Sequence, residues 1–193
     1  ILLDIFRILD SKAIKKLPTD YFTRKSGQKD GEDKEHILSQ TPRKDNGEIT
    51  TIKTDWEKFV QSEDFKGIRS QMQDILNHSD AELTEQELIQ LQNLLNSAGL
   101  NSIGNMALLD LRINRSYGNA DYTHKRTIIF QEYMNQKYVR PHTLAVFMKG
   151  DIDAREATGI PLNRWTLEDI KRNTDKIAKE IGKNFNAWLT QNN

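Results

Sequence analysis

Two short stretches define the plan of the chain: Glu35-His36-Ile37-Leu38-Ser39-Gln40 and Ser102-Ile103-Gly104-Asn105-Met106-Ala107-Leu108-Leu109. Each stretch contains an apolar run whose length suits a short strand, and Gly104-Asn105 is a turn signal. A third stretch, Asn114-Arg115-Ser116-Tyr117-Gly118-Asn119, follows the second and is itself followed by Lys125-Arg126. An acid-histidine pair combined with these spaced asparagines predicts one polar centre whose parts are separated in the sequence.

The composition is that of a polar globular protein with no overall charge bias. The 193 residues include 36% hydrophobic and 29% charged residues, and this length suits one domain with a real core. There are 28 basic and 28 acidic residues, so the chain lacks the basic field of a protein that coats nucleic acid, although a local basic groove remains compatible with this balance. The lack of cysteine excludes disulfide scaffolds, thiol catalysis and cysteine-type zinc sites.

No apolar run is long enough to cross a bilayer, and residues 1–9 do not resemble a signal peptide because Asp4 and Arg7 interrupt them. We therefore expect a cytoplasmic protein without membrane partners. The first residue is Ile1 and not methionine, from which we expect the chain to be a piece of a longer protein.

Apolar periodicity predicts a mostly helical α+β domain. Strands are expected at residues 35–38 and 106–109. Capping boxes are expected at Thr54, Thr84 and Thr166. Loops are expected at residues 19–34 and 150–161, and helices at residues 1–17, 54–61, 65–76, 84–95, 120–137, 144–148 and from 166 to about 189.

The acid-histidine pair carries the expected chemistry. A neutral imidazole, whose ordinary pKa is about 6.5, can accept a proton from water near neutral pH. A phosphodiester repels a nucleophile, and a divalent cation held by hard oxygen ligands offsets that charge. Glu35 and Asn114 carry such oxygens. Because neighbouring strand residues point to opposite faces, Glu35 and His36 can serve one centre only if the strand ends or twists there.

The three stretches together resemble the HNH, or His-metal-finger, nuclease motif. More narrowly, Glu-His-Ile-x-x-Gln, Ile-Gly-Asn-x-x-Leu-Leu and Asn-x4-Asn-x5-Lys resemble the C-terminal nuclease domain of GmrSD-type modification-dependent restriction enzymes and related phage-defence proteins. The step from Asn105 to Asn114 also resembles the HNH domain of CRISPR effector nucleases. The resemblance implies a ββα-metal finger with helical insertions and a long C-terminal helix.

The resemblance also implies roles for individual residues. His36 matches the general base and Glu35 the acidic metal ligand. Asn114 matches the amide ligand of the finger helix, and Asn105 matches the middle asparagine that braces the loop of the base. The expected cofactor is Mg²⁺ or Mn²⁺, and no zinc is expected. The polar and basic tail of the motif, where a phosphate would be held, matches Arg115, Asn119, Lys125 and Arg126.

Some features of this chain differ from the family pattern. Ser39 stands where many relatives have proline, and Glu35 stands where many HNH enzymes have aspartate, although neither change removes a type of ligand. We expect a single nuclease domain over residues 1–193, with a core at 33–138, a helical insertion at 53–99 and a C-terminal helical part at 139–193. In this family a ParB-like nucleotide-hydrolysing domain usually lies upstream, and no stretch of this chain matches it.

The expected function is hydrolysis or nicking of DNA, including modified DNA, in bacterial phage defence. Basic residues outnumber acidic ones between residues 112 and 140, which favours phosphate contacts there. Two alternatives stay open on the sequence alone. One is a catalytically silent module that binds DNA or protein, and the other is an RNA nuclease, because the chemistry acts on the phosphate.

Overall fold

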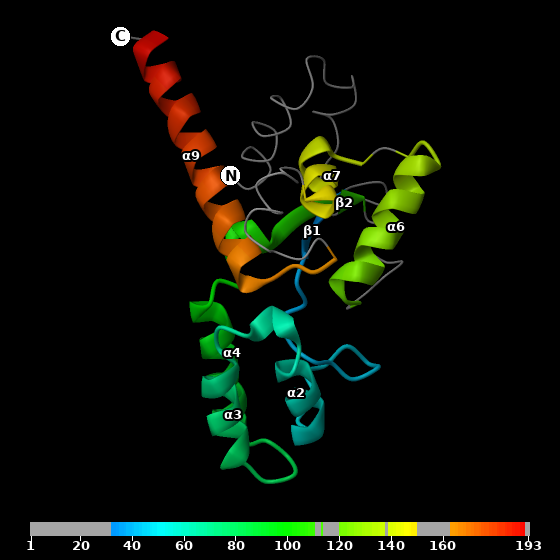
Figure 1. The fold of residues 1–193 in the computed structure, drawn as a ribbon, viewed down its shortest axis with the longest axis vertical. Helices are drawn as coiled ribbons and strands as arrows, with labels where there is room; N and C mark the ends of the chain where they lie inside the picture. Colours follow the sequence, from blue (N-terminus) through cyan, green and yellow to red (C-terminus); the bar gives the residue numbers. More distant parts are fainter. Residues whose placement is uncertain (1–31, 111–112, 114–119, 138, 150–162, 192–193) are drawn as a thin grey trace.

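The computed structural model describes residues 32–110, 113, 120–137, 139–149 and 163–191. The expected helix at residues 1–17 and the expected loop at 150–161 lie outside these residues, as do Asn114, Arg115 and Asn119. Within the described part, helices predominate around one small antiparallel sheet, which confirms the mostly helical α+β class (Figure 1). None of the described helices is long and apolar enough to span a membrane.

The sheet pairs β1 (Glu32–His36) with β2 (Met106–Asp110). In the antiparallel register Glu35 lies opposite Ala107 and His36 lies opposite Met106. Residues 106–109 are buried, as expected for a short apolar run covered on both faces. β1 begins earlier than expected, because residues 32–34 of the expected polar loop pair with the end of β2.

The long connection between the two strands forms a helical lobe, drawn below the sheet in Figure 1. It contains α2 (Lys53–Val60), the 3-10 turn η1 (Glu63–Phe65), α3 (Arg69–Asn77) and α4 (Glu85–Ser97). These elements face one another with apolar residues at helical spacing, and the indole N–H of buried Trp56 donates to the carbonyl of Thr50 at 2.8 Å. The core of the lobe contains Trp56, Val60, Phe65, Met72, Leu76, Leu91 and Leu95.

The ends of these helices test two of the expected capping boxes. Thr84 forms a complete capping box with Glu87, as expected. Thr54 does not, because α2 begins one residue earlier, at Lys53, with Ile52 at the cap and no side-chain cap bond. The bridge between Ile52 and Glu82 fixes the backbone there, since the amide of Lys53 donates to the carbonyl of Ala81 at 3.0 Å.

The end of α4 is closed by Gly99, which has a φ of +95°. Its amide donates to Asn96, and the next amide, of Leu100, donates back to Leu95 at 3.2 Å. These two hydrogen bonds are those of a Schellman motif, and glycine adopts the positive φ that this motif requires without a steric cost. The motif turns the chain out of the lobe and toward β2.

The long helix α9 (Leu167–Gln191) packs against the 3-10 turn η2 (Ile103–Asn105), which leads into β2. The expected cap is present, since the hydroxyl of Thr166 accepts from the amide of Asp169. Gly104 is the point of closest approach: a Cβ there would lie 2.1 Å from the carbonyl oxygen of Ile170. The side-chain amide of Asn173 also donates to the backbone carbonyl of Gly104 at 2.9 Å. Sequence reasoning explains Gly104 only as a turn residue, whereas its lack of a side chain is what admits α9.

On the other side of the sheet lie α6 (Tyr122–Met134) and α7 (Pro141–Met148) (Figure 1). The ring of Tyr122 stacks on Phe147 and on Trp165, with centroids 5.6 and 5.8 Å away. The helical pattern of residues 120–137 predicts buried positions at Tyr122, Ile129, Tyr133 and Met134, and Tyr122 and Ile129 are buried. Tyr133 and Met134 are not: they are 50% and 77% exposed, because α6 ends there and its last turn has no partner among the described elements.

Behind these rings lies an ion pair that no solvent reaches. The ammonium of Lys149 lies 2.8 Å from the carboxylate of Asp169, and both side chains are 0% exposed. The same carboxylate accepts from the amide of Thr166 at 3.0 Å. Lys149 has a left-handed φ of 49° and also lies over the Tyr122 and Trp165 rings. The pair therefore joins the end of α7 to the start of α9.

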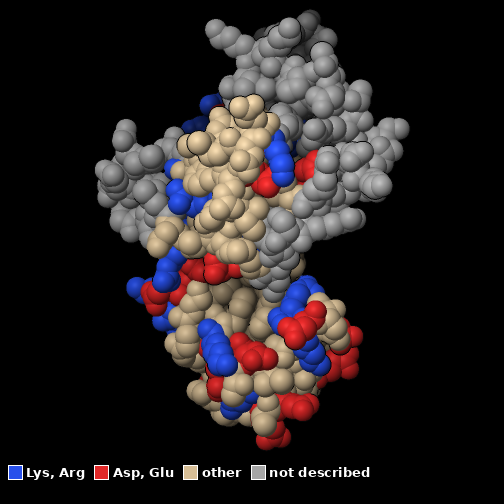
Figure 2. Space-filling model, turned by 90° about the vertical axis from the view of Figure 1, so that its right-hand side faces the viewer, with Lys and Arg blue, Asp and Glu red and all other residues tan. Residues whose placement is uncertain are grey.

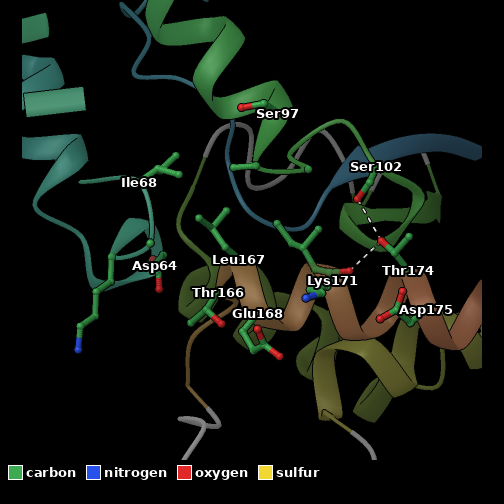
Figure 3. A pocket seen from close by; sticks show the side chains of 15 residues that line it. Asp64, Ile68, Ser97, Ser102, Thr166, Leu167, Glu168, Lys171, Thr174 and Asp175 are labelled. Atoms are coloured by element: carbon green, nitrogen blue, oxygen red, sulfur yellow. Dashed lines mark hydrogen bonds between the residues drawn. The ribbon is translucent and has the colours of Figure 1, made fainter. Parts of the chain in front are cut away.

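Among the described residues on the face shown in Figure 2, acidic and basic side chains are interspersed over the helical lobe and form no large region of one sign. A cleft of about 680 Å³ separates the lobe from the start of α9. In Figure 3 Leu167 of α9 points toward this space, which Ile68 and Ser97 of the lobe border on other sides. At its edge the Ser102 and Thr174 hydroxyls lie 3.1 Å apart (Figure 3).

Candidate active site at the end of strand β1

His36 is the last residue of β1, so the strand ends at the acid-histidine pair. The contacts of the two side chains diverge. Glu35 binds Lys125 of α6, and the His36 ring lies beside Asn101 in the turn between α4 and η2. The carboxylate and the imidazole thus belong to adjacent residues, but α6 holds the carboxylate and the turn before η2 holds the imidazole.

The loop that follows His36 is held by Asn105. The Asn105 side chain accepts from the amide of Leu38 at 2.8 Å and donates to the Leu38 carbonyl at 3.0 Å and to the Leu100 carbonyl at 2.9 Å. Its own backbone carbonyl accepts from the amide of Ile37 at 2.9 Å. Asn105 is fully buried, so every polar atom of its side-chain amide is satisfied inside the protein. Asn105 thus holds both residues directly after the expected base, Leu38 through its side chain and Ile37 through its backbone carbonyl.

Ser39 also anchors this loop through its side chain. Its hydroxyl donates to the carbonyl of Ala120 at 3.0 Å, just before α6. The hydroxyl thereby connects the loop after His36 to the start of α6. Proline would constrain the backbone but could not make this bond.

Lys125 lies under the pair and not on the surface. Its side chain is 1% exposed, and its ammonium donates to Glu35 Oε1 at 2.8 Å and to the backbone carbonyl of His36 at 2.6 Å. Burial lowers the pKa of the Lys125 ammonium, whereas the neighbouring charge of Glu35 and the hydrogen bond with it raise the pKa. The expected phosphate contact of Lys125 stays a prediction. In this structure its ammonium holds the Glu35 carboxylate and the backbone carbonyl of His36 in place.

Arg126 also has intramolecular partners. Its Nε donates to the carbonyl of Phe147 at 2.9 Å, and its guanidinium lies over the ring of Phe130 at 4.7 Å from the centroid. These contacts join α6 to the end of α7. The expected role of Arg126 toward a phosphate is likewise still a prediction.

The His36 imidazole is half-buried, and its surroundings favour the neutral form. Burial lowers its pKa below the ordinary value. The hydrogen bond with Asn101 raises the pKa, and the positive charges of Lys125, Lys34 and Arg43 lower it again. An imidazole with a lowered pKa is uncharged at neutral pH, which is the form that accepts a proton.

Among the described residues at this site, Glu35 is the candidate ligand for the expected divalent cation. Glu35 is a hard oxygen donor whose side chain is 20% exposed, and Lys125 occupies only Oε1. Oε2 has no hydrogen-bond partner among the described residues. Those residues contain no group of three acidic or histidine side chains that could hold a metal ion. Glu35 therefore fits a site that one carboxylate, one amide and water complete, with Asn114 as the expected amide outside the described part.

Sequence reasoning missed Asn101 and Asn96. Asn101 approaches the His36 ring at 3.3 Å, and it also contacts Gln40 and Asn96. These three amides line a small cavity of about 110 Å³. The only signal in the sequence is a recurrence of amide residues near the end of α4, which by itself is an ordinary surface pattern.

The fold and the strand-end geometry define a class: a mostly helical α+β domain with an acid-histidine pair at the end of a two-stranded hairpin. The family model for the C-terminal domain of GmrSD restriction endonucleases matches residues 9–180, and the chain belongs to this family. No curated protein and no solved structure matches the chain. Family membership indicates a role of the restriction-endonuclease type, for which DNA is the implied substrate.

Proposed function

We propose that this domain hydrolyses or nicks DNA phosphodiester bonds with the help of Mg²⁺ or Mn²⁺, as an HNH-type nuclease in phage defence. One observation carries the proposal: a half-buried histidine with a lowered pKa ends a strand beside a carboxylate, on a loop that a buried asparagine holds. This combination supplies a base whose position is fixed and whose neutral form prevails at neutral pH.

His36 accepts a proton from a water molecule, which then attacks the phosphorus. Lys125 keeps the end of β1 in place through the His36 carbonyl, and it orients Glu35 through Oε1. Glu35, with Asn114, would hold the cation. When bound, the cation neutralises charge on the phosphate and stabilises the departing oxyanion. Arg115, Asn119 and Arg126 are the residues proposed to contact the substrate phosphates, and buried Lys125 is proposed to act on the site through Glu35 and the His36 carbonyl.

The test uses supercoiled plasmid with the purified chain and Mg²⁺ or Mn²⁺, with and without chelator. We expect conversion to nicked or linear DNA only with the metal. His36→Ala is expected to lower the rate by about 10² or more, since a general base is lost. The matched control is His78→Ala, because His78 is an exposed histidine at the end of α3.

Metal binding is measured separately from cleavage, by calorimetry with Mn²⁺. Glu35→Gln should weaken Mn²⁺ binding. The control Glu57→Gln, which changes an exposed residue of α2, should leave it unchanged. Equal rates for wild type and His36→Ala would contradict the assignment of the base. Lack of cleavage together with tight DNA binding would favour the silent binding module, and cleavage of RNA in preference to DNA would favour the RNA nuclease.

A further inference from the structure

An amide network surrounds the outer edge of the His36 ring. Asn101 Oδ1 lies 3.3 Å from His36 Nε2 and also accepts from the Gln40 side-chain amide. The Asn101 side-chain nitrogen donates to Asn96 Oδ1 in the last turn of α4. The contacts of Asn101 with His36 and Gln40 join segments far apart in the sequence, whereas Asn96 and Asn101 are close in the sequence.

In the structure the oxygen of the Asn101 side-chain amide, and not its nitrogen, faces the His36 ring. A carbonyl oxygen has two lone pairs, so Asn101 Oδ1 can accept from Gln40 and from the imidazole together. A flipped amide would set its own NH₂ group against the NH₂ group of Gln40, donor against donor. It would also lose the bond that its nitrogen now makes to Asn96. With Gln40 and Asn96 as the structure places them, only this orientation of the Asn101 amide makes both contacts.

An oxygen in that position can only accept, so His36 Nε2 must carry the proton. A neutral imidazole has one N–H, which leaves the lone pair on Nδ1. Within the described part of the chain Nδ1 has no hydrogen-bond partner. We infer that Asn101 is a positioning residue that selects the His36 tautomer protonated on Nε2 and so leaves Nδ1 as the nitrogen that accepts the proton from water. The role of Nδ1 as the base rests on the proposed function, whereas the assignment of the Nε2-protonated tautomer does not.

The helical lobe contributes to the site through the last turn of α4. Asn96 belongs to α4, and the Schellman turn at Gly99 brings Asn101 back to the end of β1. The lobe thus reaches the imidazole through Asn96 and Asn101. Asn101 itself is exposed, so water competes with its hydrogen bonds and the effect of losing it should be moderate.

The direct test is ¹⁵N NMR of the His36 ring nitrogens in the full chain at alkaline pH, where the ring is neutral. We expect the wild type to be protonated on Nε2. Asn101→Ala should make the Nδ1-protonated form detectable, and Asn101→Asp, whose carboxylate also accepts, should restore the wild-type pattern. The control is Asn93→Ala, an exposed asparagine on α4 one turn earlier, which should leave both ring signals unchanged.

Cleavage kinetics supply the second readout. Asn101→Ala should lower kcat by about tenfold with KM unchanged, since the ring loses orientation while DNA contacts remain. Asn96→Ala should have a smaller effect in the same direction. A wild-type ring protonated on Nδ1, or ring signals identical in wild type and Asn101→Ala, would overturn the inference. If the wild type cleaves no DNA, the proposed function fails, but the NMR result still decides the tautomer.

Discussion

The side-chain amide of Asn105 pairs with the backbone of Leu38, accepting from its N–H at 2.8 Å and donating to its carbonyl at 3.0 Å. A side chain thereby continues the hydrogen-bonding pattern of the hairpin beyond the end of β1. The loop after His36 thus keeps a strand-like pair of hydrogen bonds, although its backbone has left the sheet. This support is what fixes the position of the histidine.

Asn105→Ala should reduce the free energy of unfolding by about 3 kcal/mol, because three buried backbone groups lose their partner. Asn105→Asp should be at least as damaging. Its second oxygen would face the carbonyls of Leu38 and Leu100, to which the native nitrogen donates. Urea denaturation of the three proteins checks both expectations. An unfolding free energy within 1 kcal/mol of wild type for Asn105→Asp would contradict the assigned bonds.

Gly104→Ala should destabilise the fold by about 3 kcal/mol, at the upper end of overpacking effects. The added methyl would lie 2.1 Å from the Ile170 carbonyl oxygen and 2.7 Å from the Thr174 nitrogen, which are backbone atoms that cannot turn aside. The matched control is Gly182→Ala in α9, where a Cβ meets nothing within 4 Å. That control should stabilise the protein by up to about 1 kcal/mol through helix propensity. Thermal unfolding measures both.

Removing one member of the Lys149–Asp169 pair should cost about 3–5 kcal/mol, because the remaining charge is buried without its partner. We expect this of both Lys149→Met and Asp169→Asn. The double variant should lose less than the sum of the single losses, since no unpaired charge remains. A double-mutant cycle by urea denaturation gives the coupling. Additive losses would show that the two side chains act independently.

The pH profile of cleavage should reflect the lowered pKa of His36. The base acts when neutral, so kcat/KM should fall as pH drops through this pKa. The midpoint should lie below about 6.5, the ordinary value. Lys34→Gln removes one of the charges that lower the pKa and should move the midpoint upward. Lys44→Gln, in the turn after Arg43, is the control expected to leave the midpoint in place. A wild-type midpoint above the ordinary value would contradict the environment described for the ring.

Much of the fold follows from local pattern. The apolar run at residues 106–109, the capping boxes at Thr84 and Thr166 and the apolar periodicity of the lobe depend on neighbours in sequence, so they could be predicted. The contacts that set the site could not. The burial of Lys125 under Glu35, 90 positions away, and the approach of α9 to Gly104 depend on tertiary packing that single-sequence periodicity does not encode. Thr54 shows the same limit, since a distant bridge moved the start of α2.

The approach of α9 to Gly104 has a consequence for the order of events during synthesis. η2 and β2 leave the ribosome well before Asn173 and Thr174, which complete their packing. Until that helix emerges, the Gly104 backbone lacks its cover, and the carbonyl bound by Asn173 faces water. The hairpin that carries His36 therefore reaches its final packing only after α9 has been made. A chain interrupted before Asn173 would contain both strands and the whole helical lobe but would lack the element that clamps them together.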